Sequence, residues 1–225
     1  MQPYQVEICL DQAAYAKAAQ AHGADRVELC ARLDLDGITP SEELIAATRA
    51  AAPDLDLFVM IRPAGDFCYD RAAITQMLLE IEIAKSLGAD GIVAGALLAN
   101  GQLDIPTTQL LVDAAGPLPF TFHRAFDVCQ APMATAAQLQ EMGVSRILTS
   151  GQAATAMEGK ALLQQLLAEP STPAIMAGSG VSALHIPQLW EAGVREFHFT
   201  CHRKVGKPGF DDTKVEEVME ALQDL

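Results

Sequence analysis

The stretch 22-HGADRVELC-30 decides the fold, because it joins the end of one structural element to the start of the next. Gly23 is followed by a small residue, two polar residues and then a short, largely apolar run. Glycine is favoured just past a helix C-terminus because it accepts a positive φ without steric cost. The stretch therefore predicts a helix, a glycine C-cap and a strand.

The same unit recurs along the chain. It returns as 87-LGADGIVAG-95, 142-MGVSRILTSG-151 and 192-AGVREFHFT-200. Between these units lie further apolar strand candidates: 6-VEIC-9, 57-LFVMI-61, 119-PFTFH-123 and 173-PAIMA-177. The intervening segments have helical spacing, as in 71–87, where apolar residues at 74, 77, 78, 81 and 84 form one stripe.

Eight strands that alternate with helices within 225 residues predict an α/β fold, a (β/α)8 TIM-like barrel, formed by residues 1–225 as a single domain. A doubly wound open sheet is the competing topology. The segment 204–212 is expected to be a loop before a last helix over 213–224.

Composition narrows the classes of function. The formal net charge of −14 makes nucleic-acid or membrane partners improbable, because such a surface repels phosphate backbones and anionic lipids. We find no signal-peptide pattern and no apolar run of 18 residues. The five cysteines form no C-x-x-C pair, which favours reduced thiols and a cytoplasmic location.

Ionisable residues gather where strand candidates end. In 119-PFTFHRAFDV-128, an apolar run changes abruptly to His123, Arg124 and Asp127. Arg62 and Ser150 follow other strands in the same way. Barrels of this kind carry their chemistry at the carboxyl ends of the strands, so we expect these groups to face the barrel mouth.

The first two strand candidates carry acids and thiols inside otherwise apolar runs. Side chains alternate along a strand, so Glu7 shares a face with Cys9, and Glu28 shares a face with Cys30. Neighbouring strands lie about 4.8 Å apart, too close for two carboxylates to ionise cheaply. One must hold a proton, or a cation such as Arg62 or a metal must lie between them.

The two glutamates and the two cysteines each leave two interpretations open. The acids are either a satisfied ion pair with Arg62 or part of a functional site. Each cysteine alone is typical of a core residue, whereas two on one face could hold a soft ion such as Cu(I).

Two glycine loops each follow a strand candidate and precede a helix. They are 150-SGQAAT-155 and 177-AGSGVS-182, and their N–H groups could bind an anion. Phosphate often binds after strands seven and eight of a barrel, where Gly178, Ser179 and Gly180 fall. Among the histidines His123 is the best functional candidate, while the role of His198, in the middle of a strand candidate, stays open.

Several of these segments together resemble the CutC family, which is named for copper homeostasis. The resemblance covers about residues 5–200, and TFHRAFD (121–127) and LTSGQAAT (148–155) are its most specific motifs. Further matches are GADRVELC (23–30), TPS (39–41), IRP–GDFCY (61–69), LGADGIV (87–93) and GSGV (178–181). The sequence departs from the family pattern after IRP, where Ala64-Gly65 stands in place of Arg-Gly-Gly.

The resemblance implies a TIM-like barrel in the cytoplasm that forms a homodimer or larger homo-oligomer. It implies Cys9 and Cys30 as ligands of Cu(I), the one cofactor expected. The matching mouth groups look like an enzyme site: Glu7, Glu28, Arg62, His123, Arg124 and Asp127.

Two hypotheses follow, and in each the partner is a copper ion or a small molecule. The first is a copper-handling protein with Cys9 and Cys30 as its ligands. The second is an isomerase, lyase or aldolase acting on a small phosphorylated or carboxylated metabolite. There Glu7, Glu28, His123 and Asp127 would be catalytic. The ligand-binding residues would be Arg62, Arg124, Ser150, Gly178, Ser179 and Gly180.

Overall fold

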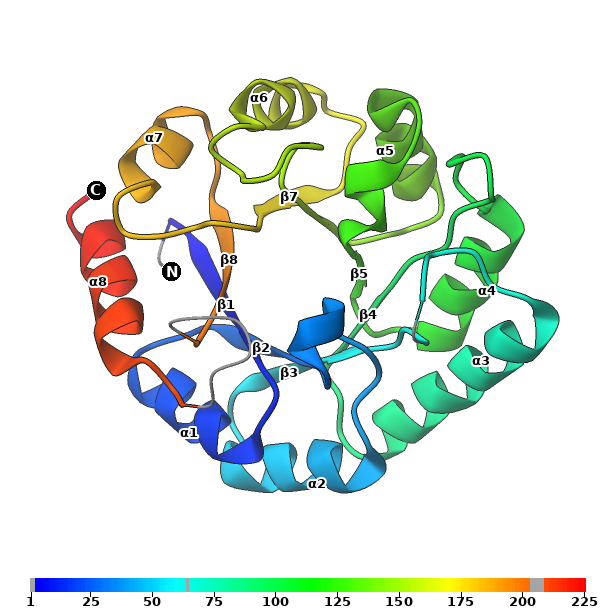
Figure 1. Ribbon diagram of the computed structural model, residues 1–225, viewed down its shortest axis with the longest axis horizontal. Coiled ribbons are helices and arrows are strands. Elements are labelled where there is room, and N and C mark those ends of the chain that lie inside the picture. The colour runs from blue at the N-terminus through cyan, green and yellow to red at the C-terminus, as the bar shows by residue number, and fades with distance from the viewer. Residues whose placement is uncertain (1–2, 64, 203–208) are drawn as a thin grey trace.

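The computed structural model describes residues 3–63, 65–202 and 209–225, in which strands and helices alternate around a ring (Figure 1). The strands are β1 Gln5–Leu10, β2 Arg26–Leu29, β3 Asp56–Met60, β4 Gly91–Ala94, β5 Phe120–Phe122, β6 Arg146–Thr149, β7 Ala174–Ala177 and β8 Glu196–Thr200. The helices are α1 Ala13–Ala21, α2 Glu42–Ala51, α3 Arg71–Ser86, α4 Ile105–Ala115, α5 Pro132–Glu141, α6 Lys160–Ala168, α7 Ile186–Glu191 and α8 Asp212–Gln223. Two 3-10 turns, η1 Leu33–Leu35 and η2 Arg124–Val128, follow β2 and β5.

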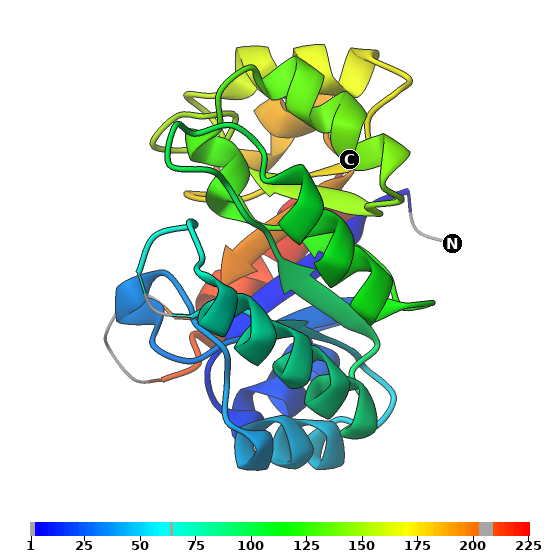
Figure 2. The same ribbon diagram turned by 90° about the vertical axis from the view of Figure 1, so that its right-hand side faces the viewer.

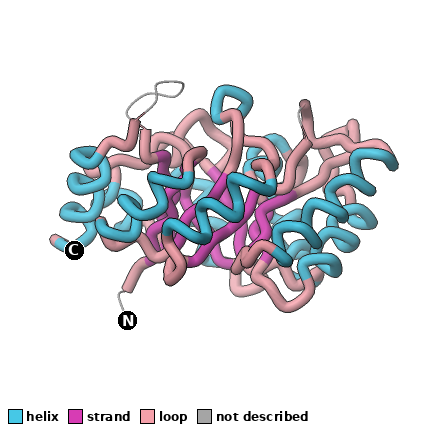
Figure 3. The backbone as a smooth tube through the Cα atoms, turned by 90° about the horizontal axis from the view of Figure 1, so that it is seen from below, coloured by secondary structure: helices cyan, strands magenta, loops and turns pink. Residues whose placement is uncertain are grey.

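The strands close into a barrel. Each strand pairs in parallel with the next along the chain, and β8 pairs with β1, which leaves no open edge. Helices surround the strands on all sides, and loops form the two rims (Figures 2 and 3). This closure confirms the (β/α)8 barrel and excludes the doubly wound alternative.

The helix–glycine–strand unit is confirmed in all four of its occurrences. Gly23, Gly88, Gly143 and Gly193 follow the ends of helices and have φ between +82° and +98°. The predicted helix over 71–87 is α3, and the predicted last helix is α8. Of the predicted loop 204–212, residues 204–208 lie outside the described residues, as does Ala64 in the loop that departs from the family pattern.

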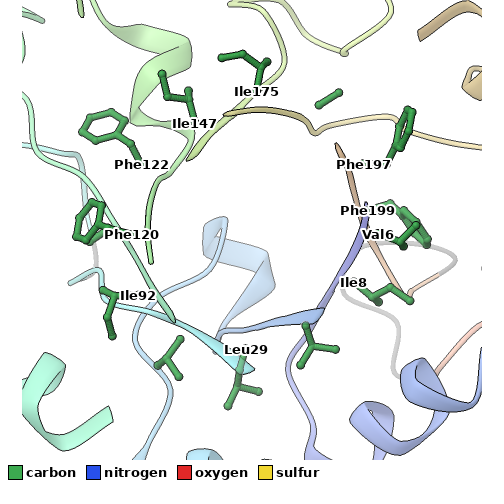
Figure 4. Packing of buried hydrophobic residues seen from close by; sticks show 14 of the residues in the cluster. Val6, Ile8, Leu29, Ile92, Phe120, Phe122, Ile147, Ile175, Phe197 and Phe199 are labelled. Atoms are coloured by element: carbon green, nitrogen blue, oxygen red, sulfur yellow. The ribbon is translucent and has the colours of Figure 1, made fainter. Parts of the chain in front are cut away.

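The main hydrophobic core lies between the strands and the helices. Alternate residues of each strand point outward into it, among them Val6, Ile8 and Leu29 (Figure 4). The remaining residues point into the barrel, where a second apolar cluster contains Cys9, Cys30, Phe58, Met60 and Val93. This confirms that Cys9 and Cys30 share the inner face, with Val6 and Ile8 on the other side.

Ionic side chains fill the barrel near the amino ends of its strands. Arg26 donates from Nε to Glu7 at 2.8 Å and from Nη2 to Glu196 at 2.6 Å, and Arg146 also pairs with Glu196. Both guanidinium groups lie 5.5–5.6 Å from the centre of the Phe58 ring. We call this group, Glu7, Arg26, Phe58, Arg146 and Glu196, the lower network.

Within the described ranges, every helix is too short or too polar to cross a bilayer.

Candidate functional site

A cavity of about 500 Å³ opens at the carboxyl ends of the strands, where the sequence places the site. The turn η1, blue in Figure 1, lies over the centre of the ring of strands, and its Leu33 lines the cavity. Nine of the predicted site residues also line it: Cys9, Glu28, Cys30, Arg62, His123, Arg124, Asp127, Ser179 and Gly180. Glu7, Ser150 and Gly178 are not among the lining residues.

Cys9 and Cys30 meet at the floor of the cavity. In the pairing of β1 with β2, Cys9 lies opposite Glu28, and Cys30 follows directly after β2. The two Sγ atoms are 3.4 Å apart, and both side chains are buried. The hydrogen bond to Cys30 and burial both raise the pKa of Cys9. The hydrogen bond with Cys9 acts to lower the pKa of Cys30, but burial and the charge of Glu28 outweigh it and raise that pKa above its ordinary value. Without a cation, the two thiols therefore stay protonated.

His198, rather than Arg62, is the cation between the two glutamates. Its Nδ1 lies 2.7 Å from Oε1 of Glu7, and its Nε2 lies 3.4 Å from Oε2 of Glu28. Of the two interpretations left open, the ion pair of the glutamates with Arg62 is therefore wrong. Barrel closure brings β8 beside β1, and the register places His198 directly opposite Glu7.

The two glutamates differ in their protonation. Burial acts to raise the pKa of Glu7, but the hydrogen bond from His198 and the charge of Arg26 outweigh it and bring the pKa to about 2. Burial raises the pKa of Glu28 to about 7, against the opposing charge of His198. Burial acts to lower the pKa of His198, yet the charge of Glu28 and the contacts with Cys9 and Glu7 raise it well above its ordinary value. One carboxylate is thus fixed as an anion and the other titrates near neutrality.

Glu7 lies below the cavity and belongs to the lower network. Its side chain is fully buried, with Oε2 bound to Arg26 and Oε1 to His198. The expectation that Glu7 faces the mouth is wrong, because the strand alternation places it one layer below Cys9. Its action on the site is to orient His198.

Arg62 braces the loops around the mouth. Its Nη1 donates to the carbonyl oxygens of Leu35 and Gly37, and its Nη2 donates to that of Gly65, at 2.8–2.9 Å. Its guanidinium carbon lies 4.9 Å from the centre of the Phe67 ring. Arg62 therefore joins η1 to the loop after β3 while it lines the cavity.

His123 is a neutral, buried imidazole. Its Nδ1 accepts a hydrogen bond from the Ala125 N–H at 3.3 Å, which caps η2. Burial and the nearby charge of Arg62 lower the pKa of His123 to about 3. At ordinary pH the ring therefore carries its proton on Nε2, and Nε2 is buried with no hydrogen-bond partner among the described residues.

Arg124, Asp127 and Ser150 form a brace between η2 and the loop after β6. Asp127 accepts from Arg124 Nε at 2.7 Å, from Thr149 Oγ1 at 2.5 Å and from the Ser150 N–H at 2.9 Å. Ser150 Oγ is bound to the carbonyl of Ala153 at 2.6 Å. The carboxylate of Asp127 is occupied by these donors, an arrangement that suits a positioning residue better than a proton donor.

The predicted glycine loop 178–180 lies at the rim. Ser179 Oγ donates to the Ala154 carbonyl at 2.8 Å, and the Ser179 carbonyl accepts from the Ala156 N–H at 2.9 Å. A Cβ on Gly178 would lie 2.5 Å from Cδ1 of Leu148. Close packing thus accounts for Gly178, while Ser179 and Gly180 border the cavity.

Among the lining residues that were not predicted as site residues are His198 and Lys214. His198 could have been found from the alternation in 196-EFHFT-200, which gives it the same face as Glu196 and Thr200. Lys214 of α8 donates from Nζ to the carbonyls of Thr200 at 2.6 Å and His202 at 3.1 Å. No local sequence signal brings Lys214 to the mouth, because the packing of α8 places it there.

The grouping of Cys9, Glu28 and His198 suits a metal ion. One ligand atom from each lies within 4.8 Å of the other two. Thiol and imidazole donors suit soft or borderline ions. The second thiol, from Cys30, adjoins this group through Cys9.

Comparisons with known proteins agree with these motifs. The sequence profile of the CutC family matches residues 4–203. A CutC family protein of Klebsiella pneumoniae strain 342 is 45% identical over 86% of this chain and 78% of its own length. One of Bacteroides thetaiotaomicron is 45% identical over 91% of this chain and 84% of its own.

Solved structures are similar as well. The crystal structure of a CutC protein from Streptococcus agalactiae superposes with a TM-score of 0.81 at 29% identity, covering 87% of this chain and 97% of that one. Thiamine phosphate pyrophosphorylase from Pyrococcus furiosus gives a TM-score of 0.68 at 13% identity over 99% and 97% of the two chains, which shows a shared fold alone.

Proposed function

Because this chain belongs to the CutC family, whose profile matches residues 4–203, we propose that it handles copper by binding one Cu(I) ion between Cys9 and Cys30. The observation that carries this proposal is the 3.4 Å separation of the two Sγ atoms. A metal–thiolate bond is about 2.3 Å long, so one ion can bind both sulfur atoms at this spacing. The Streptococcus agalactiae relative carries a copper-homeostasis name, which supports the same function.

The surroundings favour a soft cation at this position. Two thiolates beside Glu28 would be costly in a buried site, and a bound cation would offset that cost. His198 stands beside Cys9 as a third donor, and it is oriented by Glu7. Thiolate ligands select Cu(I) over hard ions such as Mg²⁺ or Ca²⁺.

The test is a Cu(I) titration under anaerobic conditions against a competing chromophoric chelator. We expect the wild type to bind one ion tightly and the double variant C9S/C30S to lose that binding. C68S is the matched control, since Cys68 is an exposed thiol near the same rim and should leave the affinity unchanged. Equal affinity of the double variant and the wild type would refute the copper site.

A second candidate function is catalysis on a small phosphorylated or carboxylated metabolite, by isomerase, lyase or aldolase chemistry. It is favoured by two buried polar atoms without partners among the described residues, Oε1 of Glu28 and Nε2 of His123. Both residues line a cavity much larger than a single ion. Glu28 would act as the acid or base.

Thermal-shift screening of metabolites tests this second function. A substrate should stabilise the wild type and be converted by it, whereas E28Q should still bind and lose conversion by several hundredfold or more. E80Q, on the outer helix α3, is the control. A substrate converted equally by E28Q would exclude Glu28 from the chemistry.

We further propose that the protein works in the cytoplasm as a homodimer or larger homo-oligomer. All five cysteines are free thiols, as a reducing compartment and a Cu(I) site require. Sedimentation equilibrium and cell fractionation test these two points. A monomer at micromolar concentration would exclude the homo-oligomer.

A further inference from the structure

The mouth cavity holds polar groups that the copper site does not use. Its volume of about 500 Å³ falls within the range of pockets for small organic ligands. His123 and Arg62 line it from the ends of β5 and β3. Neither residue belongs to the group of Cys9, Cys30 and His198 that would hold Cu(I).

His123 offers a hydrogen-bond donor in a fixed position. The Ala125 N–H occupies Nδ1 at 3.3 Å, so the proton of the neutral ring resides on Nε2. His123 is 2% exposed, and within the described part of the chain Nε2 has no acceptor. A buried donor without a partner is costly, which indicates that an acceptor from outside the protein satisfies it.

Arg62 offers a positive charge without a counter-ion. It is 7% exposed, and its Nη donors bind the carbonyls of Leu35, Gly37 and Gly65 within the described residues. No carboxylate of the described residues forms a salt bridge with it, and the undescribed positions 1–2, 64 and 203–208 contain no Asp or Glu. A buried cation normally has an anionic partner.

The two groups are close to each other and share one neighbour. The Phe67 ring packs against both, with its centre 4.9 Å from the Arg62 guanidinium carbon and 5.0 Å from the centre of the His123 ring. Lys214 adds a further positive charge to the cavity wall, and its Nζ is bound only to carbonyl oxygens among the contacts described above. Arg62, His123 and Lys214 therefore suit an oxygen-rich anion on their part of the wall, in a cavity that Glu28, Asp36 and Asp127 line elsewhere.

We propose that Arg62 and His123 form a recognition site for a small organic oxyanion, a carboxylate or a phosphate ester. His123 Nε2–H donates a hydrogen bond to one oxygen, and Arg62 supplies the opposite charge. This rests on the second candidate function and deepens it by naming the two residues that recognise the anionic group of its ligand. It does not depend on Cu(I), because it uses neither cysteine.

Two substitutions of His123 separate binding from folding. H123N keeps an acceptor near the position of Nδ1 for the Ala125 N–H but removes the donor at Nε2. H123Q keeps a donor near the position of Nε2 but loses the cap of η2. The probes are pyruvate, inorganic phosphate and 3-phosphoglycerate, which distinguish a carboxylate, a bare phosphate and a ligand with both groups.

Binding is measured by calorimetry, and the ring nitrogens by NMR of protein labelled with ¹⁵N-histidine. We expect the Nε2–H tautomer of His123 in the free protein and a saturable shift of its signal with at least one probe. H123N should fold, with some loss of melting temperature because the ring packed on Phe67 is gone, and should bind that probe about 10-fold or more weakly. H123Q should recover most of the affinity at a lower melting temperature.

Two results would overturn the proposal. One is the absence of any saturable shift or heat with all three probes at 20 mM. The other is a folded H123N variant that binds within twofold of the wild type. C9S/C30S should bind the probe normally, so failure of the copper proposal and failure of this one are distinguishable. These experiments measure binding and not turnover, so the catalytic candidate is tested separately, and a probe that binds but is not converted would refute that candidate alone.

Discussion

At the residue scale, the thiols of Cys9 and Cys30 define how copper binding should depend on pH. The pKa of each is raised, so both hold protons throughout the neutral range. Cu(I) binds thiolates, and each thiol must therefore release a proton. Acid competes with the metal for the same sulfur atoms.

We predict that the Cu(I) affinity falls as the pH falls, by up to about 100-fold per pH unit from the two thiols, and more steeply when His198 also releases its proton to bind the ion. Chelator competition at pH 6, 7 and 8 measures the slope. Calorimetry in buffers of different ionisation enthalpy counts the released protons. An affinity independent of pH would mean that the two thiols are not the ligands.

His123 gives a second prediction, for stability. Its pKa is about 3 in the fold against 6.5 for the ordinary group, so the folded state binds its proton less well than the unfolded state. A lowered pKa contributes stability that is complete above pH 6.5 and is lost as the pH falls toward 3. At pH 5 the loss amounts to about 2 kcal/mol.

Denaturant unfolding at pH 7.5 and pH 5 tests this contribution. H123N lacks the titrating ring but keeps the cap of η2, so its stability should fall less between these two values. H22N is a suitable control, because His22 lies at the C-terminal end of α1 and is not among the residues that line the cavity. If the wild type and H123N lose equal stability, protonation of His123 is not linked to folding.

At the element scale, periodicity allowed most of the fold to be predicted. The glycine after each helix and the alternation in β1 and β2 correctly placed the strands and the inner faces of Cys9 and Cys30. The ion pair could not be predicted in this way. His198 is 191 residues from Glu7, and only closure of β8 onto β1 brings them together.

Arg62, one of the cations considered as a partner of the glutamates, could not be placed by sequence pattern. Following a strand places a side chain near the mouth but does not say which groups it contacts. In the structure, the guanidinium group of Arg62 binds the carbonyl oxygens of Leu35, Gly37 and Gly65 instead of a glutamate. Backbone acceptors of irregular loops leave no pattern in the sequence, so this contact could not be foreseen.

The strand β4 supports a packing prediction. A Cβ on Gly91 would lie 2.5 Å from Cζ of Phe58, whose ring lies beside Arg26 and Arg146. G91A should therefore lower the free energy of unfolding by about 1–3 kcal/mol. Chemical denaturation measures this free energy. In the F58L background, G91A should lower the free energy of unfolding by less. Equal costs in both backgrounds would show that the ring is not the obstacle.

At the scale of the whole molecule, the barrel has two layers with different tasks. The lower network fills the amino ends of the strands with paired charges, and the mouth collects the thiols and the cavity. Breaking a buried ion pair by removing one charge is costly, so the lower network bears on folding. Glu7 is the link between the layers, because it binds Arg26 below and His198 above.

Glu7 and Glu196 therefore allow a matched comparison, because both bind Arg26 and Glu7 also binds His198. Within the described part of the chain, E196Q disturbs the ion pairs with Arg26 and Arg146, so it should lower the melting temperature and leave the Cu(I) affinity within twofold of the wild type. E7Q should lower the melting temperature too, and it should also weaken Cu(I) binding about 10-fold. The carboxylate behind a metal-binding histidine typically contributes this much. If E7Q and E196Q were equal in Cu(I) affinity, His198 would not take part in copper binding, and the two cysteines alone would hold the ion.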